Sequence, residues 1–193
     1  MAGGSSQHES VVSQYRRRLL GDLTGTVIEV GPGNGANLPY YPHDIQWTGI
    51  EPNPFMHRFL HDTAAQIRMT VDLRLGSGEQ LDVADASADA IVCTLVLCSV
   101  RDPLILLREV MRVLKPGGRF VFIEHVAAPV GSPLRLAQNL AQPVWSFLGD
   151  GCHPNRETWI ALESAGFAHL DFERFNAPVP IAGPHMAGVA YRM

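Results

Sequence analysis

Three closely spaced glycines, Gly31, Gly33 and Gly35, directly follow an apolar run at residues 27–30. A second apolar run, at residues 46–50, ends in Glu51, about 20 residues after the first glycine. Glycines remove the Cβ atoms that would keep a ligand away from the turn, and the backbone N–H groups there can face an anion. A carboxylate at the end of the next strand can accept hydrogen bonds from both hydroxyl groups of a ribose. This pairing predicts a site for a nucleoside-containing cofactor.

The glycines alone leave two cofactor classes open, because Gly31, Gly33 and Ala36 also satisfy the dinucleotide pattern G-x-G-x-x-G/A. Glu29, two residues before the first glycine, favours a different cofactor. Its E-x-G-x-G-x-G arrangement resembles the first motif of class I S-adenosylmethionine (SAM) methyltransferases. A carboxylate near the turn suits a ligand that carries an ammonium group and a sulfonium, and it would repel a pyrophosphate. The stretch therefore predicts a SAM site, and an NAD-dependent oxidoreductase is the alternative.

Strand-like and helix-like patterns alternate along the rest of the chain. Strands are predicted at residues 27–30, 46–50, 71–75, 88–94, 118–124, 170–175 and 187–191. Helices are predicted at residues 10–20, 54–66, 103–114, 132–148 and 155–165. Alternation of this kind predicts an α/β fold: a doubly wound, mostly parallel seven-stranded sheet with helices on both faces, as in Rossmann-like class I methyltransferases. Ligands bind such sheets at the carboxyl ends of the strands.

Further segments resemble methyltransferase motifs in the expected order. Residues 76–81 correspond to the segment that holds adenine in the family, although Ser77 stands where the family often has Asp. Residues 85–92 match a D-x-S-x-D run, and residues 114–118 match an L-x-P-G-G turn. The resemblance assigns cofactor contacts to the glycine turn and to the ends of the next three strands. These contacts are Glu29, Gly31, Gly33, Gly35, Asn37, Glu51, Pro52, Asn53, Ser77, Gly78, Glu79, Thr94 and Leu95.

Later segments carry a closer resemblance. They are residues 93–100, 124–128, 150–152, 177–178 and 184–185. They are similar to the small methyltransferase-like branch whose animal members are membrane-associated alkyl thiol methyltransferases. The resemblance implies methyl transfer to a small lipophilic thiol, with an O- or N-acceptor or a noncatalytic SAM-binding subunit as alternatives. Those relatives carry an apolar N-terminal anchor, whereas residues 1–8 here are polar, so membrane attachment is not expected.

Methyl transfer from a sulfonium requires alignment, exclusion of water and a deprotonated acceptor, and it yields S-adenosylhomocysteine (SAH). A thiol has a pKa of about 8.5, so a nearby histidine is sufficient help. His125, at the end of the fifth predicted strand, and Asp150 and His153, in a later loop, are the predicted catalytic residues. A structural role in the core is the alternative for His125.

Other chemically active residues have structural interpretations. Cys152 is interpreted as a packed small hydrophobe, because the mechanism needs no covalent intermediate. His57 and His61, one helical turn apart, and the basic residues 16–18 are interpreted as solvated helix faces. His185 is a weaker candidate for the pocket wall. Apolar side chains are predicted to close the pocket, with ordinary core packing as their alternative: Tyr15, Tyr40, Tyr41, Pro143, Trp145, Phe147 and Trp159.

Length and composition predict one domain over residues 1–193, which the resemblance implies is a methyltransferase domain, with a flexible tail at 1–9 and an N-terminal helix or lid at 10–25. A net charge of −4 and scattered basic residues predict no nucleic acid partner. The resemblance implies a small-molecule substrate, and the oligomeric state stays open. No apolar run reaches about 18 residues, which predicts a cytoplasmic protein without membrane insertion. Cys93, Cys98 and Cys152 form no C-x-x-C pair, so no metal site is expected.

Overall fold

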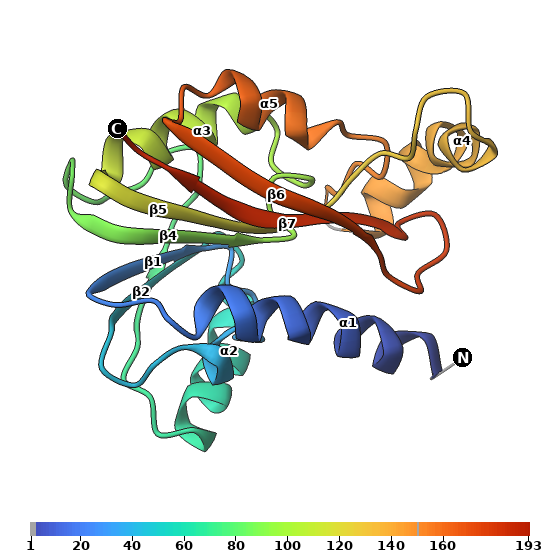
Figure 1. Ribbon diagram of the computed structural model, residues 1–193. Helices are drawn as coiled ribbons and strands as arrows, with labels where there is room; N and C mark the ends of the chain where they lie inside the picture. Colours follow the sequence, from blue (N-terminus) through green and yellow to red (C-terminus); the bar gives the residue numbers. More distant parts are fainter. Residues whose placement is uncertain (1–2, 150) are drawn as a thin grey trace.

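The computed structural model describes residues 3–149 and 151–193 and contains a seven-stranded sheet in the order β3-β2-β1-β4-β5-β7-β6 (Figure 1). The strands are β1 (Thr26–Val30), β2 (Gln46–Glu51), β3 (Asp72–Leu75), β4 (Ala88–Thr94), β5 (Leu114–His125), β6 (His169–Asn176) and β7 (Pro184–Tyr191). The helices are α1 (Gly3–Leu20), the 3-10 helix η1 (Leu38–Tyr40), α2 (Pro54–Gln66), α3 (Pro103–Val113), α4 (Pro133–Leu148) and α5 (Thr158–Ser164). The predicted doubly wound, mostly parallel sheet is confirmed.

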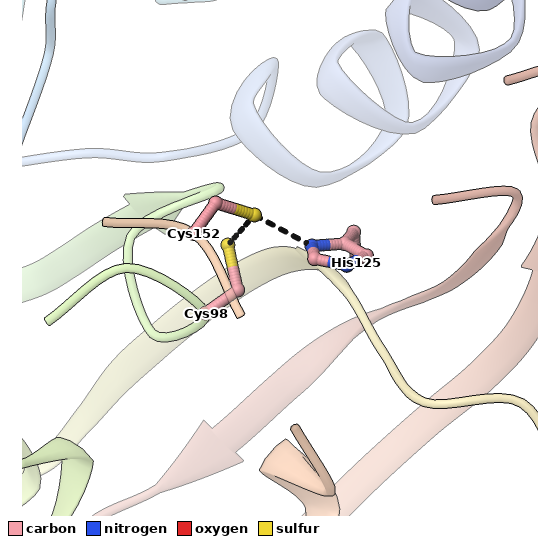
Figure 2. Close-up of side chains that lie close together, drawn as sticks. All are labelled: Cys98, His125 and Cys152. Atoms are coloured by element: carbon pink, nitrogen blue, oxygen red, sulfur yellow. Dashed lines mark hydrogen bonds between the residues drawn. The ribbon is translucent and has the colours of Figure 1, made fainter. Parts of the chain in front are cut away.

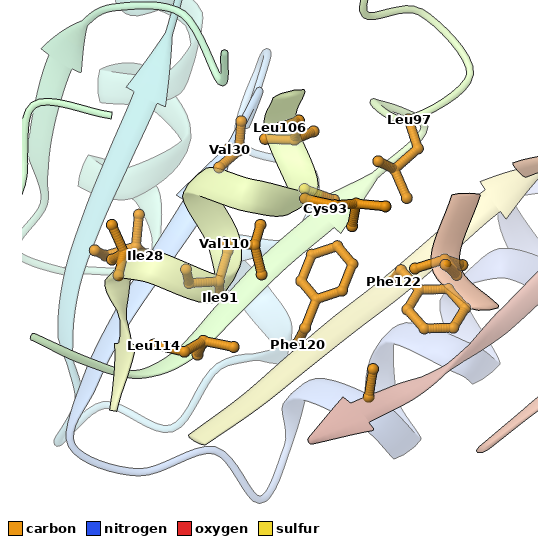
Figure 3. Packing of buried hydrophobic residues seen from close by; sticks show 14 of the residues in the cluster. Ile28, Val30, Ile91, Cys93, Leu97, Leu106, Val110, Leu114, Phe120 and Phe122 are labelled. Atoms are coloured by element: carbon orange, nitrogen blue, oxygen red, sulfur yellow. The ribbon is translucent and has the colours of Figure 1, made fainter. Parts of the chain in front are cut away.

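The two faces of the sheet are covered by different helices (Figure 1). On one face, α3 contributes Leu106 and Val110 to a core that includes Phe120 and Phe122 of β5 (Figure 3). On the other face, α1 and α2 pack Leu20 and other apolar residues against β1, β2 and β5. Burial on both faces explains why the central strands are mostly apolar and do not alternate strictly between apolar and polar residues.

Proline and a capping side chain begin three of the helices. The N-cap residues Asn53, Asp102 and Ser132 each accept a hydrogen bond from a backbone N–H in the first helical turn, and a proline follows each of them. The predicted starts of α2 and α3 therefore agree with the structure. Helix α5 begins at Thr158 rather than at residue 155. Strand β5 begins at Leu114 rather than at residue 118, because Leu114, in the predicted turn at 114–118, pairs with Ala88 of β4.

The N-terminal helix differs from prediction. It begins at Gly3, so the tail expected to be flexible is helical from that residue. Val12 is buried against Ile123 and Ala187, and Tyr15 stacks on Phe175 with ring centroids 3.9 Å apart. This packing holds the helix on the sheet. Among the described residues, no helix is long and apolar enough to cross a membrane.

Strand β7 lies between β5 and β6 and is antiparallel to both. Because of this direction, the first residues of β7 meet the last residues of β5. His185 is the register partner of His125. The two predicted pocket histidines therefore come together although 60 residues separate them in the sequence.

Candidate active site

A cavity of about 1100 Å³ opens at the carboxyl ends of the parallel strands. We divide its lining into two named walls. The glycine wall comprises Gly31, Gly33, Glu51, Pro52, Ser77, Gly78 and Glu79. The cysteine wall comprises Cys98, His125, Trp145, Cys152, Pro178 and His185. Small-molecule sites commonly measure about 300–1,000 Å³, so the cavity has room for a cofactor and a second small molecule.

Backbone geometry shapes the glycine wall. Gly31 and Gly33 have φ values of +64° and +56°, which side-chain-bearing residues rarely adopt. Glu51 fastens this turn, because its Oε2 accepts a hydrogen bond from the Gly33 N–H at 2.9 Å. Its Oε1 accepts one from the Asn53 N–H at 2.8 Å. Each carboxylate oxygen retains a second acceptor site that can bind a ribose hydroxyl.

Glu29 does not line the cavity, contrary to the role predicted for it. It is buried beneath the glycine turn, where its carboxylate accepts hydrogen bonds from Asn37 (2.8 Å), Tyr41 (2.8 Å) and Trp47 (3.1 Å). Burial raises the pKa of Glu29 to about 7, although these three donors oppose the shift. Glu29 therefore supports the turn from below.

Asn37 connects this buried group to the rest of the molecule. Its side chain also donates to the Thr94 hydroxyl at 2.9 Å and accepts from Nε of Arg16 at 2.7 Å. Arg16 is thus a buried residue rather than part of a solvated face, whereas Arg17 and Arg18 are exposed as predicted. Besides Glu29, four predicted cofactor contacts lie outside the cavity lining: Gly35, Asn37, Asn53 and Thr94.

Ser77, Glu79 and Leu95 do line the cavity. Ser77 Oγ accepts from the Glu79 N–H at 3.2 Å, and Glu79 Oε1 accepts from the Asp102 N–H at 3.0 Å. Leu95 directly follows β4 and has a φ of +60°, a strained value for a residue with a side chain. Such strain is typical of functional sites, and here it bends the chain from β4 into the cavity wall.

Three reactive side chains meet in the cysteine wall (Figure 2). Sγ of Cys152 lies 3.6 Å from Sγ of Cys98 and 3.2 Å from Nδ1 of His125. The hydrogen bonds that Cys152 makes with Cys98 and with His125 lower the pKa of the Cys152 thiol, and burial opposes this shift. The same bond to Cys152, together with burial, raises the pKa of Cys98. Cys152 is therefore the more acidic thiol of the pair, and it lines the cavity in addition to packing as a small side chain.

Buried polar contacts hold the cysteine wall in place. Glu124 accepts hydrogen bonds from the backbone N–H groups of Val96, Leu97 and Cys98, and burial raises its pKa to about 7. Arg156 donates to the carbonyl oxygens of Leu97 and Val100 at 2.7 and 2.6 Å. The loop after β4 is thus fixed from two sides.

The other predicted catalytic and wall residues have different placements. His153 contacts Arg156 through Nδ1 at 3.2 Å and does not line the cavity, whereas Asp150 lies outside the described residues. His185 lines the cavity, and its Nδ1 donates to the Gly183 carbonyl at 2.9 Å. Of the aromatic residues and proline proposed for the wall, Trp145 lines the cavity. The others do not: Tyr15, Tyr40, Tyr41, Pro143, Phe147 and Trp159.

Sequence reasoning missed Cys98 as a site residue. The residues of the Cys98–His125–Cys152 group are 27 positions apart in each interval, so no local spacing reveals them. The available signal was that each of the three lies in a segment carrying the closer family resemblance. His57 and His61 are different: His57 Nε2 contacts the Glu51 carbonyl oxygen and His61 is exposed, in agreement with a helix surface.

Comparisons with known proteins agree with this geometry. A family model described as a methyltransferase domain matches residues 28–122. Thiol S-methyltransferase TMT1B of Rattus norvegicus is 43% identical over 182 residues, covering 89% of this chain and 74% of the relative. Thiol S-methyltransferase TMT1A of Homo sapiens is 43% identical over 172 residues, covering 86% of this chain and 70% of the relative.

Solved structures share the fold at low sequence identity. The cyclase SpnF superimposes with a TM-score of 0.75 at 18% identity, covering 95% of this chain and 80% of its own. A SAM-dependent methyltransferase from Aquifex aeolicus gives a TM-score of 0.62 at 17% identity, covering 96% of this chain and 89% of its own. The matched domain, the relatives and the shared fold show that this chain belongs to the class I methyltransferases, enzymes whose cofactor is S-adenosylmethionine.

Proposed function

We propose that this enzyme transfers the methyl group of SAM to the sulfur of a small lipophilic thiol. The observation that carries the proposal is that one cavity with a mostly apolar lining joins the glycine wall to the cysteine wall. The names of the TMT1A and TMT1B relatives support the same acceptor chemistry. The cavity volume supports simultaneous binding of donor and acceptor, which an in-line transfer requires.

The cofactor occupies the glycine wall in this proposal. Glu51 accepts the ribose hydroxyls with the lone pairs left free by Gly33 and Asn53, and Gly31 and Gly33 let the ligand approach the backbone. Ser77, Gly78 and Glu79 border the adenine. Glu29, Asn37 and Thr94 act from behind the wall by fixing the turn.

The chemistry then depends mainly on positioning and on the protonation state of the acceptor. SAM is an activated electrophile, so a thiolate aligned with the methyl–sulfonium bond attacks without further activation of the donor. The thiolate's electron pair forms the new S–CH3 bond, and the pair of the broken bond stays on sulfur to give SAH. We assign His125 to the acceptor because it lies in the cavity wall next to Cys152.

Turnover of SAM to SAH with a matched panel of acceptors tests the proposal. The panel pairs each alkyl thiol with the alcohol and the amine of the same carbon skeleton, so that size and apolarity stay constant. We expect SAH and a thioether with the thiols, and little product with the other two classes. Equal or faster turnover of an alcohol or amine would contradict the assignment of the acceptor while leaving the methyltransferase class intact.

A further inference from the structure

Cys98, His125 and Cys152 come together from three separate segments: the loop after β4, the end of β5 and the loop after α4 (Figure 2). Their potential donor atoms all lie within 4.8 Å of one another, the arrangement of a possible metal site among the described residues. All three residues line the cavity. The group therefore combines three potential ligands with access for a small molecule.

The separations approach those of ligands around tetrahedral zinc. Bonds of about 2.3 Å for Zn–S and about 2.0–2.1 Å for Zn–N place two sulfurs about 3.8 Å apart, and a sulfur and a nitrogen about 3.6 Å apart. The two observed edges are 3.6 Å for sulfur to sulfur and 3.2 Å for sulfur to nitrogen. Small movements of the side chains are sufficient to admit a cation.

The donor set and its charge suit the surroundings. Two thiolates and one neutral imidazole form a neutral complex with Zn²⁺, which is compatible with the nearly complete burial of Cys98 and His125. The neighbouring charges are already engaged, because Glu124 binds backbone N–H groups and Arg156 binds backbone carbonyls. Three protein ligands with a fourth position open are typical of catalytic rather than structural zinc sites.

We propose that Cys98, His125 and Cys152 bind one thiophilic divalent cation, Zn²⁺ by its donor set, with a fourth coordination position that faces the cavity. Three of the segments that carry the closer family resemblance, residues 93–100, 124–128 and 150–152, each supply one ligand. The expectation that the chain has no metal site followed from local cysteine spacing, which this arrangement does not use.

The role of the cation rests on the proposed thiol methylation. The acceptor thiol occupies the fourth position, where the Lewis acid favours loss of its proton to solvent water. The thiolate's electron pair then forms the S–CH3 bond as the methyl–sulfonium bond breaks, and that bond's electron pair remains on SAH. The thioether product is neutral and binds the cation more weakly than a thiolate, so it leaves.

Cobalt titration of the reduced, chelator-treated protein tests the site directly, because thiolate-bound Co²⁺ has a charge-transfer absorption that needs no turnover. We expect one equivalent of Co²⁺ with this absorption, and displacement by Zn²⁺. Cys98→Ser, His125→Ala and Cys152→Ser should each weaken binding by at least about 100-fold, since loss of even an outer-shell partner costs about 10–100-fold.

Two matched variants control for removal of a cysteine or a histidine. Cys93→Ala changes the third cysteine, which is buried in β4 away from the group, and His153→Ala changes a histidine that contacts Arg156. Both should bind Co²⁺ as the wild type does. Stabilisation by SAM, measured as a shift in Tm, establishes that each variant is folded, and Cys152→Ser is the decisive variant because Cys152 is only partly buried.

The outcomes separate the metal site from the proposed function. Absence of Co²⁺ binding by the reduced wild type, or unchanged binding by folded Cys152→Ser, would overturn the site. A small thiol should shift the cobalt bands where the matched alcohol does not, and no shift would overturn the role in acceptor binding. Full-rate thiol methylation by metal-free enzyme would overturn the role of the cation and keep the proposed function. Binding of one Co²⁺ without SAH formation from any thiol would keep the metal site and overturn the proposed function.

Discussion

The two walls of the cavity are built by different means. The glycine wall uses backbone N–H groups, glycines with positive φ and the carboxylate of Glu51, all of which lie between Gly31 and Asn53, and residues 77–79 complete it. The cysteine wall brings together Cys98, His125 and Cys152, which are 27 positions apart in each interval, and buried contacts of Glu124 and Arg156 hold it in place. A cofactor that is the same for a whole family can be bound by local backbone, whereas an acceptor site requires side chains that tertiary structure brings together.

Gly33→Val, in the glycine wall, should have the largest effect on SAM binding. Gly33 has a φ of +56° and open space where a Cβ would stand, so the valine side chain projects into the cofactor volume and strains the turn. We expect loss of measurable SAM binding in calorimetry. Gly117→Val is the matched control, because Gly117 has a φ of +75° and equally open space but does not line the cavity. A Gly33→Val protein that still binds SAM would place the cofactor elsewhere.

Glu51→Ala should have the next largest effect. It removes the acceptor for the ribose and also releases the Gly33 and Asn53 N–H groups, so SAM affinity should fall by about 2–3 kcal/mol. Asp62→Ala, which removes an exposed carboxylate of α2, serves as the control. Unchanged affinity in Glu51→Ala would refute its assignment to the ribose.

His125→Ala tests whether the cysteine wall acts on the acceptor alone. Turnover with an alkyl thiol should fall roughly 10- to 100-fold while the Kd for SAM stays nearly constant, the pattern of an interaction made mainly in the transition state. The loss should shrink for more acidic thiols, which arrive already ionised. His153→Ala should be close to wild type. Equal losses for acidic and ordinary thiols would show that His125 positions the acceptor without helping its ionisation.

Glu29→Gln should affect stability more than reaction rate. The folded pKa of Glu29 is about 7 and its ordinary value is 4.5, so the folded state keeps a proton that the unfolded state releases between these values. The wild type should therefore lose stability relative to Glu29→Gln as pH rises from about 4.5 to 7, by roughly 3 kcal/mol at most. Denaturant unfolding of both proteins at several pH values measures this difference. A difference that is constant with pH would mean that folding does not shift the pKa of Glu29.

The sequence predicted the sheet well because its strands and helices alternate with clear apolar patterns and capping residues. It also located the glycine wall, because Gly31, Gly33 and Glu51 lie on consecutive elements of a parallel sheet. The role of Glu29 was misjudged, since sequence spacing does not show which side of the turn a side chain faces. Cys98 was missed, and Cys152 was interpreted as a packed hydrophobe, because their proximity depends on tertiary contacts between the loops after β4 and α4. Arg156 joins these loops through the carbonyl oxygens of Leu97 and Val100.

Arg16 has a dynamic consequence for the N-terminal helix. Its bond to Asn37 joins α1 to the hydrogen-bonded chain that runs through Asn37 to Glu29 and Thr94. The described residues of α1 are not part of the cavity lining. A cofactor that orders the glycine turn nevertheless also restrains α1 through this series of hydrogen bonds. Local opening of α1 then becomes rarer when SAM is bound, so its amide protons exchange with solvent more slowly in the complex than in the free enzyme.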